Sequence, residues 1–274
     1  MQENPMNLVN QVIDEQHKDE PAITRRRMVA GAGAVLGSMG VLGAADAMAQ
    51  KRTGPSYDGP NTPENIINVA ATAEVLATIV NTVALERTPD LDRTTRSNIQ
   101  AAAREELIHY EVLTSDAIGA KPITKRIWVP DDVFESRDRT LITLVVGDQA
   151  FINAYLLGTT VFARAGGSSN SRLARIAAEF MGVEAVHRAL ALQSLGRLGN
   201  DRVFMRFGGR EEAQGLPTTG QTGFYDITKA TDVFTDAGFG FGKQGSKAGR
   251  FYDYDEVQRR TPNPAAALNT KTPS

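Results

Sequence analysis

Two Glu-x-x-His motifs are the residues most able to do chemistry in this chain. The stretch EELIHYEVL places Glu106 three positions before His109, and VEAVHRALA places Glu184 in the same relation to His187. Positions three apart lie on one face of an α-helix, so each motif presents a carboxylate and an imidazole to the same point. Carboxylates can bridge two cations while each imidazole holds one of them. The chain has three histidines, and the two in these motifs predict a divided metal site.

Composition limits the kind of metal that such a site could hold. There are no cysteines, which excludes disulfides, thiolate metal sites and iron–sulfur clusters. A metal must therefore be bound by carboxylates and imidazoles, which suit iron, manganese or zinc. The net charge is only -2, so nothing indicates nucleic acid as a partner.

Either motif alone has an ordinary explanation, which is an amphipathic helix that happens to carry a histidine. The neighbouring residues argue against it. Glu106 continues an apolar stripe that begins at Ile99, and Glu184 follows Phe180 on another. An ionised carboxylate on a core-facing stripe is costly unless it is paired or bound to metal. The stripes favour a metal site and leave paired, metal-free acids as the alternative.

Four long stretches have apolar residues with a period near 3.6, which predicts α-helices. These helices are expected at residues 63–87, 93–118, 138–165 and 171–198. Thr62 is the expected N-cap of the first helix, with Pro63 at its first helical position. Glu74 lies on the apolar face of the first helix and Asp148 on that of the third. Every predicted helix thus places an acid toward the core, in an all-α fold.

The predicted links have a short–long–short pattern. The first and third links have about five and four residues, enough only for antiparallel hairpins. The second link, GAKPITKRIWVPDDVFES, is several times longer and contains two prolines. Extended, it could reach roughly 60 Å, against about 40 Å for a helix of the predicted size. It could therefore cross the whole bundle, as in single-crossover bundles.

The number of residues between each acid and the nearest link predicts which acids lie at the same height along the helices. Glu74 precedes the first link by as many positions as Glu106 follows it, so these two are expected to meet. In the second hairpin Asp148 lies farther from the predicted link than Glu184 does. The difference is nearly one helical turn, about 4–5 Å, so Asp148 is expected to lie too far from the link unless the third helix carries a bulge or the link takes up the difference. In the third helix, the residue that lies as far from the link as Glu184 does is Phe151.

The pattern formed by Glu74, Glu106-x-x-His109, an acid in the third helix and Glu184-x-x-His187 resembles the ferritin-like superfamily. Over residues 62–198, and most strongly around REELIHYEVL, the chain is similar to bacterial exported ferritin-like domain proteins related to plant desiccation-related proteins. The resemblance implies a four-helix bundle of two antiparallel hairpins joined by a long crossover, with a di-iron or di-manganese centre. The implied metal ligands are Glu74, Glu106, His109, Asp148, Glu184 and His187, with Glu74 and Asp148 as the single-carboxylate ligands.

The function implied by this resemblance is the handling of oxygen, peroxide or iron in envelope stress protection. Some members of such groups lack a full ligand set. A metal-free, non-catalytic bundle with a structural or stress-protective role is therefore the alternative, and the sequence does not decide whether the protein is an enzyme. The expected partners are metal ions, oxygen or peroxide, and a second copy of the chain.

The N-terminal residues follow an export pattern. Three consecutive arginines, Arg25 to Arg27, precede an uncharged Gly/Ala-rich segment from Met28 to Ala45. Ala47-Met48-Ala49 then offers a small-x-small cleavage site. We expect a twin-arginine signal over residues 1–49, and hence a periplasmic or extracellular protein with no membrane contact after cleavage. A retained membrane helix is the alternative, because the uncharged segment is near the lower limit of length for spanning.

The remaining segments flank the predicted bundle, residues 62–199. Residues 50–61 are polar and turn-forming, which predicts a linker. Residues 200–274 are rich in Gly and Pro and predict an irregular extension, in which a short helix could form at 227–235. Two phenylalanines in its GFGF stretch could wrap the extension around the bundle, or the stretch could be mobile.

Overall fold

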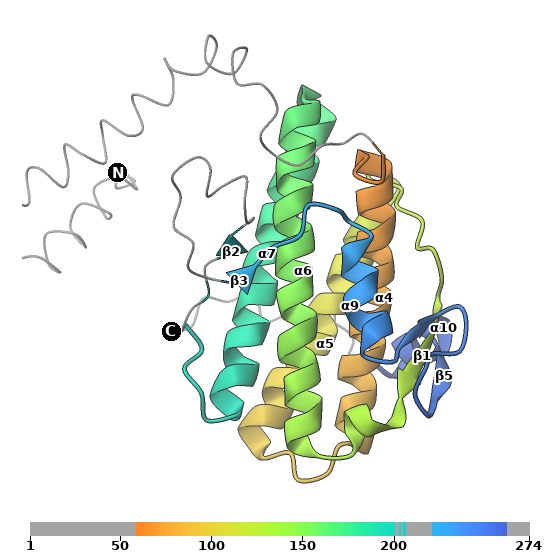
Figure 1. The fold of residues 1–274 in the computed structure, drawn as a ribbon, viewed down its shortest axis with the longest axis vertical. Helices are drawn as coiled ribbons and strands as arrows, with labels where there is room; N and C mark the ends of the chain where they lie inside the picture. The colour runs from red at the N-terminus through yellow and green to blue at the C-terminus, as the bar shows by residue number, and fades with distance from the viewer. Residues whose placement is uncertain (1–58, 201–202, 204, 207–220, 262–274) are drawn as a thin grey trace, which may run out of the picture. The chain divides into compact units, whose positions relative to one another are not determined.

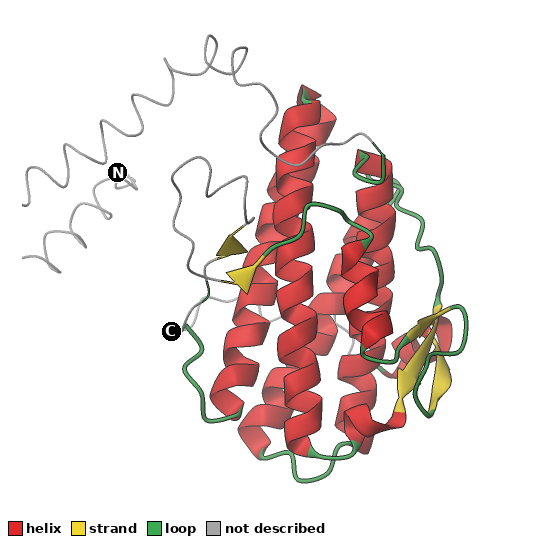
Figure 2. Ribbon diagram, viewed as in Figure 1, coloured by secondary structure: helices red, strands yellow, loops and turns green. Residues whose placement is uncertain are grey.

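The structure is a computed structural model that describes residues 59–200, 203, 205–206 and 221–261. The predicted twin-arginine signal and most of the predicted linker lie outside the described residues. The described part is mostly helical, as Figure 2 shows. Its four long helices are α4 (Pro63–Arg87), α5 (Arg93–Thr114), α6 (Arg137–Ala165) and α7 (Gly167–Ser194).

Polar side chains cap the N-termini of α4 and α5. Thr62 accepts a hydrogen bond from the Asn65 amide at 3.2 Å, and Pro63 is the first residue of α4, as predicted. Asp92 caps α5 in the same way, accepting from the Thr95 amide at 3.0 Å. These caps fix the start of both helices of the first hairpin.

The predicted bounds of two helices are wrong. The second helix was expected to reach residue 118, but α5 ends at Thr114 because Ser115 takes extended backbone angles. The fourth was expected at 171–198, but α7 spans Gly167–Ser194 and is stopped by Gly196, whose φ is 73°. The earlier start of α7 changes how Asp148 and Glu184 line up across the second hairpin.

The four long helices lie side by side, and the long link runs beside them from one end to the other (Figure 1). As a result α6 starts at the same end as α5, and the two run in the same direction. Within this link the structure contains β1 (Arg126–Pro130) and a 3₁₀ helix, η1 (Asp131–Phe134). The sequence did not predict either element.

Residues 221–261 are more regular than predicted. Strands β4 (Gly240–Phe241) and β5 (Gly249–Asp253) pair antiparallel with the two edges of β1. A short helix, α9 (Lys229–Asp236), lies close to the predicted one and packs on α6. The remaining elements are the paired strands β2 (Met205–Arg206) and β3 (Gln221–Thr222), the helix α10 (Tyr254–Val257) and the 3₁₀ helix η2 (Gln258–Arg260).

The extension covers the outer side of the helices. Phe239 is 3% exposed, and Phe241 packs against the same apolar cluster, so the GFGF stretch wraps the helices rather than moving freely. The helix α10 packs on α4. As a result α4 is covered on nearly every side. Both α4 and α6 are long and apolar enough to span a membrane, but 83% of the most apolar window of α4 is buried inside the fold, so its apolarity is explained by packing.

Candidate metal centre

Each of the four long helices contributes to one cluster of buried acids and histidines. Glu74, Glu106 and Glu184 have no exposed surface. His109 and Asp148 are buried as well, and the His187 side chain is 10% exposed. The three-dimensional structure thus brings together the six candidate ligands that the sequence predicted.

The level of Asp148 differs from the prediction. Only Gly166 separates α6 from α7, and it and Gly167 take positive φ values of 70° and 78°, which glycine adopts without strain. Asp148 then precedes Gly166 by as many positions as Glu184 follows it. The expectation that Asp148 lies a turn too far from the link is wrong, because it counted the first turn of α7 as part of the link.

The cluster consists of two overlapping groups. In the first, Glu74 and His109 approach Glu106 and Glu184; in the second, Asp148 and His187 approach the same two glutamates. Within each group the ligand atoms lie within 4.8 Å of one another. Two cation positions that share two carboxylates are the arrangement expected of a dinuclear carboxylate site.

The shared glutamates each direct one oxygen toward each histidine. Glu106 Oε2 lies 3.5 Å from His109 Nδ1, and Glu106 Oε1 lies 3.1 Å from His187 Nδ1. The corresponding distances for Glu184 are 3.3 Å from Oε1 to His109 and 3.5 Å from Oε2 to His187. Two ligands of one ion, each about 2.1 Å from it, lie about 3.0–3.4 Å apart. The spacing therefore fits atoms that bind a common ion.

The buried ligand atoms lack other partners. Among the described residues, no hydrogen bond reaches the carboxylate oxygens of Glu106 and Glu184, Glu74 Oε2, or Nδ1 of His109 and His187. Seven buried polar atoms without hydrogen bonds in one place are costly, because each has lost its hydration. A pair of cations bound between them would satisfy all seven, so the donor set fits two metal ions.

Aromatic residues pack around the group that contains Glu74 and His109. Phe180 stacks on His109, with ring centroids 3.9 Å apart, and meets Tyr155 edge to face. The Tyr155 hydroxyl donates a hydrogen bond to Glu74 Oε1, leaving Oε2 free to face His109 at 3.6 Å. Tyr155 was not among the site residues predicted from the sequence. Its place seven positions after Asp148, two turns along the same face of α6, is the signal that could have identified it.

We expect Tyr155→Phe to lower the free energy of unfolding by about 1–3 kcal/mol, because it leaves a buried carboxylate oxygen without its donor. Tyr254→Phe is the matched control. Tyr254 is also fully buried, but its hydroxyl has no hydrogen-bond partner among the described residues. Its removal should be neutral or stabilising. Urea unfolding of the two variants would test this, and equal losses in both would contradict the role given to Tyr155.

The electrostatics of the metal-free cluster favour bound protons. Burial lowers the pKa of His187, but Glu106 and Glu184 more than offset this and raise it to about 11. For His109 burial is likewise outweighed by Glu74 and the other acids, and the pKa lies well above its usual value. Burial raises the pKa of Glu74 and Asp148 well above the usual range. When no metal is bound, protons on these groups therefore neutralise part of the negative charge of the cluster.

Glu106 behaves differently from Glu74 and Asp148. Burial raises its pKa, but the attraction of His187 and His109 prevails and holds the pKa well below its usual value. The charged form of the shared glutamate is therefore favoured within the fold. A carboxylate that stays ionised at all ordinary pH values is a ready metal ligand.

The metal-free protein should become less stable as the pH rises. Because the pKa of His187 is about 11 in the folded chain, against 6.5 for an unperturbed histidine, its stabilising contribution is complete below pH 6.5 and is lost progressively up to about pH 11. His109, Glu74 and Asp148, with raised pKa values, act in the same direction. Chemical unfolding in the presence of a chelator should give a lower stability at pH 9 than at pH 6. A higher stability at pH 9 would show that these protons do not support the fold.

A buried arginine lies beside the group that contains Asp148 and His187. Arg188 is 5% exposed, donates a hydrogen bond to Gln149, and interacts electrostatically with Asp148. Burial lowers the pKa of Arg188, while Asp148 raises it. Arg188 adds positive charge next to a site of four carboxylates, and its place directly after His187 gave no sign of this in the sequence.

No family model matches this chain, and neither does any curated protein or solved structure with which it was compared.

Proposed function

We propose that this chain is an exported protein with a ferritin-like four-helix bundle that holds a di-iron or di-manganese centre and handles oxygen, peroxide or iron in envelope stress protection. The observation that carries the proposal is the set of seven buried oxygen and nitrogen atoms that have no hydrogen bond within the described part of the chain, arranged in two groups that share Glu106 and Glu184. Buried atoms of this kind need cations or protons, and two groups with shared carboxylates suit two cations.

The arrangement of the helices supports the bundle. Di-metal bundles take one carboxylate from each of two helices and a Glu-x-x-His pair from each of the other two. Here α4 and α6 supply Glu74 and Asp148, while α5 and α7 supply the two pairs. The long link that lets α6 start at the same end as α5 supports the single-crossover topology of ferritin-like bundles (Figure 1).

Iron or manganese bound here would supply electron transfer to or from oxygen or peroxide. The chain's own residues would do the rest. Glu106 and Glu184 would hold two ions close together, and His109 and His187 would each bind one of them. Tyr155 orients Glu74, and the surrounding apolar side chains limit access of water to the carboxylates. The absence of thiolates leaves oxygen and nitrogen ligands only, which suit these metals.

Export is supported by the sequence alone, through the three arginines and the Ala-Met-Ala cleavage site within residues 1–49. The twin-arginine route carries folded proteins, so the metal could be loaded before export. The periplasm or the cell exterior is the proposed location.

A metal-free bundle is the second candidate, and one observation favours it. Contacts of 3.1–3.6 Å between carboxylates and histidines also fit buried ion pairs between charged groups. In that case the chain would serve a structural or stress-protective role without redox chemistry.

Metal analysis would separate the two candidates. The protein should be purified from its native export route, together with the double variant Glu184→Ala/His187→Ala. We expect about two iron or manganese ions per chain in the unaltered protein, as in di-metal bundles, and a loss of metal in the variant. Less than about 0.2 ions per chain in both, with equal thermal stability, would contradict the metal centre and support the metal-free bundle.

A further inference from the structure

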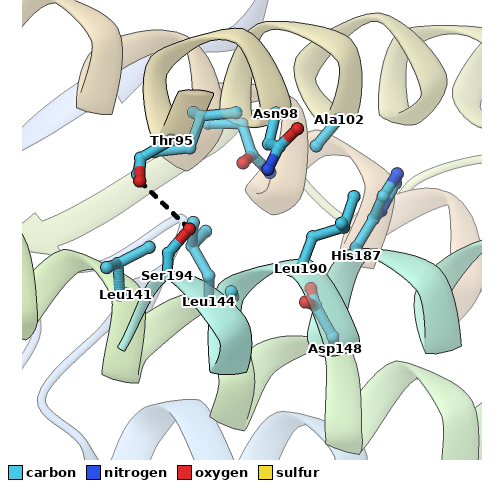
Figure 3. Close-up of a pocket in the computed structure, with 12 residues that line it drawn as sticks. Thr95, Asn98, Ala102, Leu141, Leu144, Asp148, His187, Leu190 and Ser194 are labelled. Carbon is cyan, nitrogen blue, oxygen red and sulfur yellow. Dashed lines mark hydrogen bonds between the residues drawn. The ribbon is translucent and has the colours of Figure 1, made fainter. Parts of the chain in front are cut away.

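One pocket connects the end of the helices with the second metal position. It has a cavity volume of about 20 Å³, enough to hold a water molecule. Figure 3 shows the Thr95–Ser194 hydrogen bond on one side of this pocket and Asp148 with His187 on the other. Thr95 is in the first turn of α5, and Ser194 is the last residue of α7. The pocket therefore leads from the helix ends toward the cluster.

The pocket lining offers oxygen atoms to a divalent cation that has lost part of its water shell. It contains the amides of Asn81 and Asn98 and the hydroxyls of Thr95 and Ser194, together with apolar side chains. Its one acid is Asp148, and the residues that line it include no lysine or arginine. Amide and hydroxyl oxygens can replace part of the water shell of a divalent cation, and the carboxyl group of Asp148 at the inner end can then bind the ion.

Along α4, from the pocket toward Glu74, the described residues include buried oxygen atoms without hydrogen-bond partners. Asn81 is 3% exposed and lines the pocket, yet its Oδ1 has no hydrogen-bond partner among the described residues. Thr78 is fully buried, and its Oγ1 has no partner either. Thr78 and Asn81 follow Glu74 by four and seven positions on one face of α4. Apolar packing does not explain buried oxygens in this row, whereas water or a passing cation does.

The opposite side of the cluster is closed. There Phe180 covers the His109 ring, and the Tyr155 hydroxyl bonds to Glu74. A cavity of similar volume next to Tyr155 is lined almost entirely by apolar side chains from α4, α6 and α9. Dehydrating a cation in such a cavity would be costly. The two metal positions therefore differ in access: the one with Glu74 and His109 is enclosed, and the one with Asp148 and His187 faces the polar pocket.

From this asymmetry we infer that the pocket lined by Asn81, Thr95, Asn98 and Ser194 is the access path for divalent cations, which exchange their bound water for protein oxygens along it and reach the position held by Asp148 and His187 first. This inference rests on the proposed metal centre. The ion held by Glu74 and His109 then arrives through the outer position and cannot leave before the outer ion.

Blocking the pocket should slow metal uptake without changing the amount bound. Ala102 lines the pocket one turn of α5 before Glu106. Using Co²⁺ alone as the probe, followed by its visible absorbance after rapid mixing with metal-free full-length protein, Ala102→Leu should bind Co²⁺ about tenfold more slowly than the unaltered chain. The final stoichiometry should be unchanged.

Two further variants make the test specific. Ala230→Leu places the same added side chain in the apolar cavity on the other side, and it should bind Co²⁺ at the normal rate. Asn98→Leu keeps the side-chain size nearly constant and removes an amide from the path. It should also slow uptake, and it decides the question if Ala102→Leu does not fold.

The outcomes separate the path from the centre itself. Normal uptake rates in Asn98→Leu and in a folded Ala102→Leu would overturn the access path while leaving the two-ion site intact. Equal slowing by Ala230→Leu would overturn it as well, since the effect would then be general. If the unaltered chain takes up no Co²⁺, the proposed function fails and the path with it.

Discussion

Replacing Glu106 by alanine is expected to abolish binding of both metal ions, whereas Glu74→Ala should remove only one. The reason is the position of the two carboxylates. Glu106 directs one oxygen toward His109 and the other toward His187, so both groups lose a ligand in Glu106→Ala. Glu74 belongs to the first group alone. We therefore expect about zero and about one ion per chain, against about two in the unaltered protein.

The matched control is Glu105→Ala. This neighbour is also a glutamate on α5, but it is half-buried and belongs to neither group. It should keep both ions. Elemental analysis of the four proteins after identical loading, with circular dichroism to verify folding, would provide the comparison. One ion retained in Glu106→Ala, with the same loss in Glu74→Ala, would show that Glu106 does not bridge.

Metal loading should raise the melting temperature by about 10 °C or more. At a free metal concentration of about 100 times Kd, each ion adds about 2.7 kcal/mol to the stability of the native state, or about 5 kcal/mol for two. For a chain of this size, each kcal/mol corresponds to about 2–4 °C. The effect is expected to be large because the ions neutralise four buried carboxylates, which burial otherwise destabilises in their charged forms.

Thermal unfolding with Mn²⁺ or Fe²⁺, compared with chelator, would measure this shift. Glu106→Ala should show no increase under the same conditions, which distinguishes the buried centre from weak binding to surface acids. A shift below about 2 °C in the unaltered chain at saturating metal would contradict a folded-state site for two ions. The stabilisation should also increase between pH 6 and pH 8, because metal must displace the protons held by His109 and His187.

The sequence by itself determined which side chains could form the centre. A helical period of 3.6 places Glu106 with His109, and Glu184 with His187, on single faces. It also sets Glu74 and Asp148 among apolar neighbours. These are local properties, because residues one turn apart remain neighbours in any helix. For the same reason the first helix was predicted from Pro63 to Arg87, with the bounds that the structure has.

Counting from the first link also predicted that Glu74 meets Glu106, and the structure places them in one group. The other contacts between segments were decided by the tertiary structure. Helical periodicity says little about a turn, so the reversal at Gly166 and Gly167, which brings Asp148 level with Glu184, could not be read from it. The three strands of the β4-β1-β5 sheet have two to five residues each and gain their hydrogen bonds only from one another.

The contacts that distinguish the two candidate metal positions also join segments that are far apart in the sequence. The hydrogen bond from Tyr155 to Glu74 joins residues 81 positions apart, and the polar pocket is formed by all four long helices. A sequence pattern records the spacing of residues along one helix, whereas closure of one metal position and access to the other depend on how the helices pack together. The candidate ligands were therefore readable from the sequence, and the difference between the two groups that they form was not.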